Sequence, residues 1–125
     1  MKNGGEWRNW SGSEGSPASI LQPRDEAELA QALRRHAYVR PLGAGHSFMP
    51  LCAPHAPRSE TSRSALIHLG QMAGEIAIAG DRKTAVVPAG WSIARITEHL
   101  WAHGLSLPNQ GDVNPQALAG AMATG

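Results

Sequence analysis

The chain has 125 residues, of which 42% are hydrophobic and 17% are charged, and its formal net charge is +1. This length fits one modest globular domain, the hydrophobic content excludes a disordered chain, and the balanced charge excludes a surface that gathers nucleic acid or anionic membrane. The single cysteine, Cys52, excludes an internal disulfide framework. The first residues of the chain are polar, and no apolar stretch could span a bilayer. We therefore expect a cytoplasmic chain without a membrane span.

The first residues differ in composition from the rest of the chain. Residues 1–17 are rich in Gly, Ser and Asn, yet they include Trp7 and Trp10. The tryptophans favour packing against the remainder of the protein, and a loose tail is the alternative. We therefore expect an N-terminal segment, 1–17, followed by a domain over 18–125 whose apolar end suggests that it is incomplete at its C-terminus.

The next part of the chain predicts a strand, a helix and a second strand. The apolar runs 18–22 and 38–42 are strand-like. Between them, the side chain of Asp25 can accept a backbone N–H while Glu28 reaches back, which predicts a helix over 26–36. The order strand, helix, strand predicts a crossover unit with a parallel pair.

A surface loop and three more strands follow. Residues 49–64 are polar, contain three prolines and have no period, so we expect a loop. The runs 65–69, 75–79 and 84–87 are strand-like. The last two are expected to pair as a hairpin around residues 80–83.

Two further helices are predicted in the last third of the chain. Ser92 can cap a helix with apolar residues on one face, and Gly104 can end it in a left-handed conformation. Asn114 and Pro115 are expected to open a third, short helix, with Pro in the first position where its missing N–H is harmless. The sequence contains no internal repeat.

The segment Gly43-Ala-Gly-His-Ser47 is the most informative local feature. Glycines directly after a strand let backbone N–H groups turn inward and hold an anion such as phosphate. An ordinary tight turn is the alternative. A Rossmann dinucleotide motif would need a third glycine where Phe48 stands, so that interpretation fails.

Three histidines could carry chemistry. His46 could be a solvated loop residue, a hydrogen-bond donor to phosphate, or a nucleophile toward a bound electrophile. His99 and His103 lie four residues apart on the predicted second helix, where both could face one metal ion. Leu100 occupies the position of the glutamate in a zinc protease motif and no third ligand is evident, so we interpret the pair as solvent-facing and expect no metal site.

Residues 110–125 pair a glycine turn with a stretch of small side chains. Small residues let a backbone approach a flat ligand closely, and a helix start presents free N–H groups. Close helix packing is the alternative explanation.

Three motifs occur in an order that resembles a known family. They are VRPLGAGHSF at 39–48, VPAGW at 87–91 and GDVNPQALAGAMATG at 111–125. This pattern resembles the FAD-linked oxidases of the vanillyl-alcohol oxidase superfamily, and most of all the sugar-lactone and alditol oxidases. The resemblance implies an α+β fold, namely the N-terminal part of a two-subdomain PCMH-type FAD-binding domain, with a small parallel sheet and helices followed by the start of a mixed or antiparallel sheet.

The resemblance also implies which residues hold FAD. The loop from Leu42 to Ser47 matches the segment that holds the FAD pyrophosphate, and His46 matches the histidine that many members bond covalently to the flavin. Gly111 is similar in position to a small residue beside the flavin that influences dioxygen access. The expected cofactor-binding residues are Leu42, Gly43, Ala44, Gly45, His46, Ser47, Gly111, Asp112, Val113, Ala117, Gly120, Ala123, Thr124 and Gly125.

The activity implied is oxidation of a CH–OH group of a sugar lactone, alditol or related polyol, with dioxygen as acceptor and hydrogen peroxide as product. In the family the substrate pocket and the catalytic base belong to a C-terminal domain, so we assign no catalytic residue to these 125 residues and expect no turnover from them alone. The alternatives are a truncated, inactive flavin-binding fragment and a generic phosphate-loop or metal-binding domain.

Overall fold

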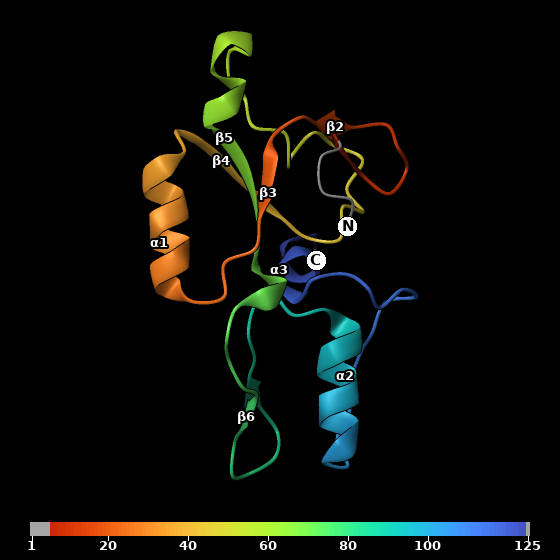
Figure 1. The fold of residues 1–125 in the computed structure, drawn as a ribbon. Coiled ribbons are helices and arrows are strands. Elements are labelled where there is room, and N and C mark those ends of the chain that lie inside the picture. The colour runs from red at the N-terminus through yellow and green to blue at the C-terminus, as the bar shows by residue number, and fades with distance from the viewer. Residues whose placement is uncertain (1–5, 125) are drawn as a thin grey trace.

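The computed structural model describes residues 6–124, and its first half is built on a three-stranded parallel sheet (Figure 1). The strands β3 (Ser19–Leu21), β5 (Ser64–His68) and β4 (Tyr38–Leu42) lie side by side in that order. The helix α1 (Glu26–Arg35) connects β3 to β4. This confirms the predicted strand, helix and strand, and with the hairpin described below it confirms the α+β class.

The predicted direct pairing of the first two strands is wrong, because β5 lies between them. Leu66 at the middle of β5 is opposite Ile20 of β3 and Arg40 of β4. Four of the five β5 residues are buried, whereas β3 and β4 carry exposed residues. A strand that is apolar on both faces is most stable when strands on both of its edges and layers on both of its faces cover it.

The helix α1 begins where its cap residue predicts. The side chain of Asp25 accepts a hydrogen bond from the backbone N–H of Glu28 at 2.8 Å. The carboxylate of Glu28 reaches back one residue further than expected and accepts from the backbone N–H of Arg24 at 2.9 Å. The helix ends at Arg35, one residue earlier than predicted, because His36 already has the extended backbone that leads into β4.

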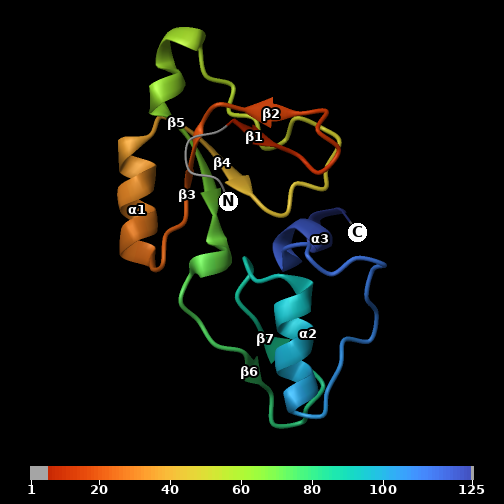
Figure 2. The ribbon, with the colours of Figure 1, turned by 45° about the vertical axis from the view of Figure 1, so that its right-hand side comes forward.

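Residues 6–17 of the N-terminal segment lie on the side of the sheet opposite α1 (Figure 2). It forms a hairpin of β1 (Trp7–Arg8) and β2 (Gly15–Ser16), which are antiparallel. Trp7 packs against a buried cluster of Ala18, Leu42 and Leu66. Of the two alternatives for this segment, residues 6–17 therefore show packing through Trp7 rather than a loose tail, whereas Trp10 is 72% exposed.

The segment after β4 contains more structure than the loop expected for residues 49–64. It includes a 3-10 helix, η1 (Arg58–Arg63), in which Arg63 and Glu60 form an ion pair at 2.7 Å. A second 3-10 turn, η2 (Leu69–Gln71), follows β5 directly. Short-range pairs of this kind stabilise one or two turns without giving the sequence a period.

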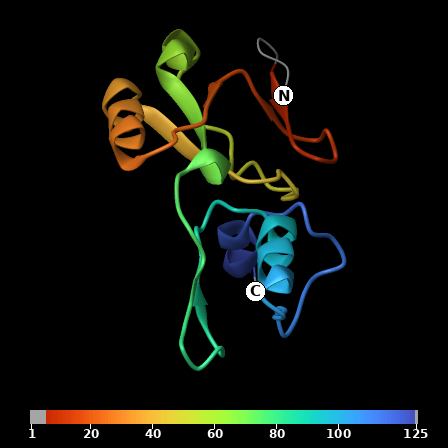
Figure 3. The ribbon, with the colours of Figure 1, turned by 60° about the horizontal axis from the view of Figure 1, so that its bottom comes forward.

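The second half of the chain packs a hairpin against a helix (Figure 3). The strands β6 (Ala77–Ile78) and β7 (Ala85–Val86) pair antiparallel, as predicted. The helix α2 (Ile93–Ala102) is capped by the Ser92 side chain, which accepts from the N–H of Arg95 at 3.2 Å. The buried members of this second core are Ile76, Trp91, Ile96 and Leu100.

The last helix begins later than predicted. Helix α3 runs over Leu118–Thr124 instead of starting at the Asn-Pro pair. The carbonyls of Asn114 and Gln116 accept hydrogen bonds from the first free N–H groups of α2, at Ala94 and Ile93. These residues therefore run in a non-helical conformation beside the start of α2, and the helix forms only after them.

Candidate functional site

The glycine loop 43–47 lies at the carboxyl ends of two adjacent parallel strands. It follows β4 directly, and the neighbouring strand β5 ends at His68 opposite Leu42. Gly45 has a φ of +73°, a left-handed conformation that a residue with a Cβ adopts only at a cost. Crevices at this end of parallel strands are where open α/β sheets bind ligands.

The backbone N–H groups of the loop are free to bind an anion. Within residues 6–124, no protein group accepts a hydrogen bond from the N–H of Ala44, Gly45, His46 or Ser47. Successive free N–H groups in a turn of mixed handedness form a concave donor set. The loop therefore offers the donors that an anion-binding turn would need, and the binding of an anion there stays a prediction.

Two residues of the N-terminal hairpin hold this loop in place. Asn9 is buried, and its amide donates to the carbonyl of Ser47 at 3.0 Å. The backbone N–H of Trp10 donates to the carbonyl of Gly45 at 2.8 Å. The sequence did not indicate this role, because the two segments are far apart in the chain and no local pattern links them.

His46 is partly buried and makes no hydrogen bond among the described residues. Its ring lies edge-to-face against Trp10, with 6.1 Å between the ring centroids. Trp10 also meets Phe48 edge-to-face, at 6.4 Å. Both ring nitrogens of His46 are thus available to a bound molecule, while the aromatic contact restricts the orientation of the imidazole.

A cavity of about 190 Å³ joins the loop to the second half of the chain. Ala44 lines it from the loop, and Ala117 lines it from the segment before α3. A Cβ on Gly43 would lie 3.5 Å from the Cβ of Ala117, so the two segments approach closely. The remaining residues that line the cavity are His68, Gly70, Gln71, Gly90, Trp91, Ser92, Arg95 and Pro115.

The charge of this cavity also suits an anion. Arg95 contributes its guanidinium, which lies 3.4 Å above the ring centroid of Trp91, and no Asp or Glu lines the cavity. A buried anion needs donors and a positive field in place of water. Arg95 and His68 were not predicted as site residues, since their place beside the loop depends on how α2 and β5 pack.

The other predicted site residues of the second segment do not line this cavity. Gly111, Asp112 and Val113 are exposed and do not line the cavity. On α3, Gly120 and Ala123 are exposed, and the hydroxyl of Thr124 donates to the carbonyl of Ala121 at 3.0 Å. The predicted residue Gly125 lies outside the described residues. The structure therefore places Ala44 of the loop and Ala117 at one cavity, and the cofactor contacts of the remaining residues stay a prediction.

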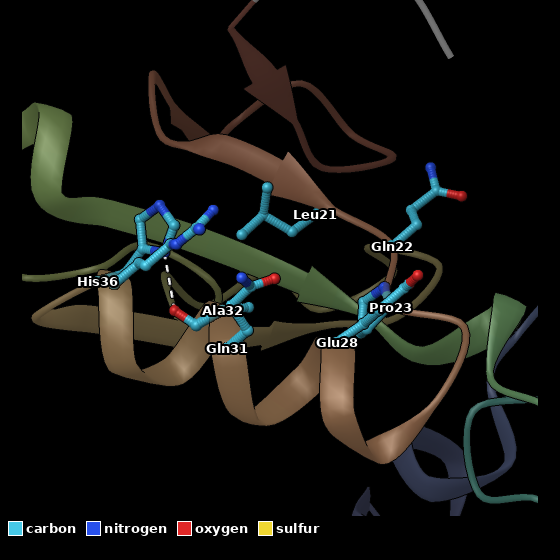
Figure 4. Close-up of a pocket in the computed structure, with 8 residues that line it drawn as sticks. Leu21, Gln22, Pro23, Glu28, Gln31, Ala32 and His36 are labelled. Atoms are coloured by element: carbon cyan, nitrogen blue, oxygen red, sulfur yellow. Dashed lines mark hydrogen bonds between the residues drawn. The ribbon is translucent and has the colours of Figure 1, made fainter.

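A larger cavity, of about 290 Å³, lies between β3 and α1 and contains none of the predicted site residues (Figure 4). The carboxylate of Glu28 is paired there with Arg24 at 2.6 Å, and this hydrogen-bonded ion pair lowers the pKa of Glu28. The Nδ1 atom of His36 is hydrogen-bonded to the carbonyl of Ala32 at 2.8 Å. Two of its polar groups are therefore already engaged within the protein.

Cys52 lies beside the start of the glycine loop. Burial raises the pKa of its thiol, and a hydrogen bond from the Gly43 backbone and the charge of Arg40 partly offset that effect. Thiolates rather than thiols are nucleophiles, so the environment of Cys52 disfavours a nucleophilic role.

In the part of the chain that the structure describes, no helix is long and apolar enough to cross a membrane.

Comparisons with known proteins agree with this geometry. A family model described as FAD binding domain matches residues 17–125. L-gulono-1,4-lactone dehydrogenase of Mycobacterium tuberculosis is 34% identical over 124 residues, which cover 94% of this chain and 27% of that protein. Alditol oxidase of Streptomyces sp. is 30% identical over 119 residues, with the same two coverages.

A solved structure shows the same fold. Cholesterol oxidase from B. sterolicum superposes with a TM-score of 0.76 at 25% identity, covering 94% of this chain and 23% of that one. The chain thus spans about a quarter of the length of the relatives it matches. With the family model covering most of its residues, this chain belongs to the FAD-binding domain family, and its cofactor is FAD.

Proposed function

We propose that this chain is the FAD-binding part of an oxidoreductase that oxidises a CH–OH group of a sugar lactone, alditol or related polyol, with dioxygen as acceptor. The names of the relatives support the substrate class, since they include a gulonolactone dehydrogenase and an alditol oxidase. The observation that carries the proposal is the glycine loop 43–47, whose N–H groups from Ala44 to Ser47 have no protein acceptor and which shares a cavity with Ala117 through Ala44.

The residues of the loop fit the diphosphate of FAD. The oxygens of the diphosphate, which carries two negative charges, would accept hydrogen bonds from the N–H groups of Ala44 to Ser47, which have no protein acceptor. Leu42 and Gly43 would lie at the base of the loop. The cavity of about 190 Å³ is smaller than the roughly 300–1,000 Å³ typical of small-molecule sites. The described residues therefore form one wall of a site for a cofactor of this size.

His46 is the proposed point of covalent attachment to the flavin. Its ring nitrogens have no protein partner among the described residues, and its ring lies edge-to-face against Trp10. A neutral imidazole with a free lone pair is a nucleophile, which is the property that attachment requires. The attachment would prevent loss of the cofactor.

The second set of cofactor contacts is proposed along residues 111–125. Ala117 is the member that lies next to the loop, and backbone contacts are proposed for Gly111, Asp112 and Val113 and for Gly120, Ala123, Thr124 and Gly125. Gly111 has no side chain to block the approach of dioxygen to the flavin face. This favours oxidase over dehydrogenase behaviour.

Bound FAD supplies the redox chemistry, because it accepts two electrons and a proton from the alcohol carbon. The residues of this chain bind and orient it, and we assign no catalytic acid or base among them. A flavin-binding polypeptide without turnover is the second candidate. It is consistent with the absence of any assigned catalytic acid or base among residues 1–125.

Reconstitution of the chain with FAD tests FAD binding and covalent attachment. We expect the flavin absorbance band of the wild-type protein to remain with the protein after acid precipitation, and that of His46→Ala to be lost from the precipitate. The control His55→Ala, in which the replaced histidine is an exposed loop residue, should keep the band. If wild-type protein releases all its flavin on precipitation, covalent attachment is wrong. These 125 residues alone are expected to form no peroxide. Peroxide formation with gulonolactone or xylitol, against cholesterol as comparison, is therefore measured on a longer polypeptide that contains this chain, where it separates the oxidase from the second candidate.

A further inference from the structure

The cavity beside the glycine loop contains an arginine that lies outside every motif of the sequence. The Cζ atom of Arg95 lies 3.4 Å above the ring centroid of Trp91. At this distance only a guanidinium nearly parallel to the ring avoids overlap with it. The N–H donors of a guanidinium lie in its own plane and point outward from its edge. The contact with Trp91 therefore covers one face of the group and leaves its donors accessible to a ligand.

Most donors of the Arg95 guanidinium have no partner in the protein. Among residues 6–124 the group makes one hydrogen bond, from Nη1 to the carbonyl of Gly70 at a long 3.4 Å, and it forms no ion pair. Gly70 is a wall of the cavity, so this contact places the edge of the guanidinium at the cavity. Arginine presents its donors in a fork that matches the oxygens of a phosphate. The cavity therefore has an unpaired cation whose shape suits such an anion.

His68 offers a second donor to the same cavity. It is the last residue of β5, and the register of the sheet places it opposite Leu42, directly before the glycine loop. Its Nδ1 atom accepts a hydrogen bond from the backbone N–H of Gly70 at 3.2 Å, so the proton of the neutral ring is on Nε2. Nε2 has no partner among the described residues. It can therefore donate to a ligand.

We propose that this cavity binds one phosphate group, with Arg95 as its counter-charge and His68 as a neutral donor. Ala44 lines the same cavity, and its backbone N–H has no acceptor within residues 6–124, so the glycine loop can contribute a third donor. No Asp or Glu lines the cavity to repel an anion. The volume of about 190 Å³ is below the roughly 300 Å³ at which small-molecule sites begin, which suits a single phosphate group with the rest of the ligand outside.

Two sources of phosphate share this chemistry, the diphosphate of FAD and free inorganic phosphate. We favour FAD, because Ala44 joins the cavity to the loop that is proposed to hold the diphosphate. With this source the inference rests on the proposed function. Arg95 then becomes a positioning residue of the cofactor, and it lies outside the motifs at 39–48, 87–91 and 111–125.

Calorimetric titration of the full chain with pyrophosphate, and separately with FAD, tests the site. In Arg95→Gln we expect the affinity for both ligands to fall about tenfold, because a charge-assisted hydrogen bond is lost. His68→Phe should lower the affinity about threefold, since only a neutral donor is removed. The matched control Arg58→Gln removes an exposed cation of η1 outside the cavity and should bind both ligands like wild type.

Salt dependence separates a charge contact from a structural role of Arg95. Its contact with Trp91 also contributes to packing, so urea unfolding of each variant is measured beside binding. We expect the pyrophosphate affinity of wild type to fall as KCl is added and that of Arg95→Gln to fall less steeply. Arg95→Lys keeps the charge without the planar fork and should recover part of the loss. A loss in Arg95→Gln with unchanged salt dependence and no recovery in Arg95→Lys would overturn the proposal.

The two ligands distinguish a failure of the phosphate site from a failure of the proposed function. Pyrophosphate that does not bind wild type, or that binds Arg95→Gln equally well, would overturn the phosphate site whatever FAD does. Pyrophosphate binding that depends on Arg95, in a chain that does not bind FAD, would contradict the proposed function and leave a site for free phosphate. Parallel losses for both ligands identify the FAD diphosphate as the occupant, and a loss for pyrophosphate alone identifies free phosphate.

Discussion

Gly45→Ala is the substitution that most clearly separates the conformation of the glycine loop from its function. The left-handed φ of +73° at Gly45 costs a residue with a Cβ about 1–2 kcal/mol. The added Cβ would also lie 3.1 Å from Cζ2 of Trp7, a close contact that would add about 1 kcal/mol if neither side moved. We therefore expect the free energy of unfolding to fall by about 2–3 kcal/mol.

Gly12→Ala is the matched control. Gly12 has almost the same φ, +75°, but no atom lies within 4 Å of its added Cβ. Its substitution should cost only the conformational part, about 1–2 kcal/mol. Urea unfolding followed by tryptophan fluorescence measures both values, and titration with FAD measures the loop. FAD affinity should fall about tenfold, or 1.4 kcal/mol, in Gly45→Ala and stay unchanged in Gly12→Ala.

Equal unfolding free energies in the two variants would refute the packing argument at Trp7. Unchanged FAD affinity in Gly45→Ala would refute the role of the loop as a donor set, because the left-handed residue determines where the N–H groups point. The two outcomes are independent, since one concerns the folded chain alone and the other concerns its ligand.

Three other experiments test single contacts in the fold. Gly90→Ala should lower the free energy of unfolding by about 1–3 kcal/mol, because its Cβ would overlap the carbonyl oxygen of Leu69. The control Gly80→Ala has open space around the added Cβ and should leave the free energy of unfolding unchanged. Asp25→Ala should cost about 1 kcal/mol by loss of the helix cap, and an unchanged urea midpoint would contradict that role. Because burial raises the pKa of the Cys52 thiol, the folded chain holds less thiolate than the unfolded chain. Iodoacetamide at pH 8 should therefore react more slowly before urea is added than after, and equal rates would contradict the shift.

The elements that the sequence predicted correctly are those specified by local signals. Asp25 and Ser92 each accept a backbone N–H at the start of a helix, as their residue types indicate. Gly104 ends α2 with a φ of +67°, a conformation that favours glycine. These features depend on a few neighbouring residues, so a single sequence is enough to recognise them.

The sequence predictions that were wrong concern features that depend on long-range contacts. The position of β5 between β3 and β4 depends on burial from both sides, which a run of apolar residues shows only in part. The late start of α3 depends on the carbonyls of Asn114 and Gln116, which bond to the start of α2. No pattern around the Asn-Pro pair shows that these carbonyls are used elsewhere.

The candidate site divides in the same way. The glycine loop was proposed from its residues, and the structure gives it free donors and a left-handed glycine, while its binding role stays a prediction. Asn9, which holds the loop, and Arg95, which lines the cavity beside it, were missed because they join the loop only through the packing of the hairpin and of α2. Residues 111–113 remain a prediction, since they are exposed and do not line that cavity.

The most direct test of FAD binding by the glycine loop is a ¹⁵N-labelled NMR titration of this chain with FAD, which detects weak binding and assigns it to individual N–H groups. We expect the amide resonances of residues 44–47 to shift most and to saturate, and those of β6 and β7 at the far hairpin not to move. Shifts confined to residues outside the loop and its cavity, or no shift at any FAD concentration, would contradict it.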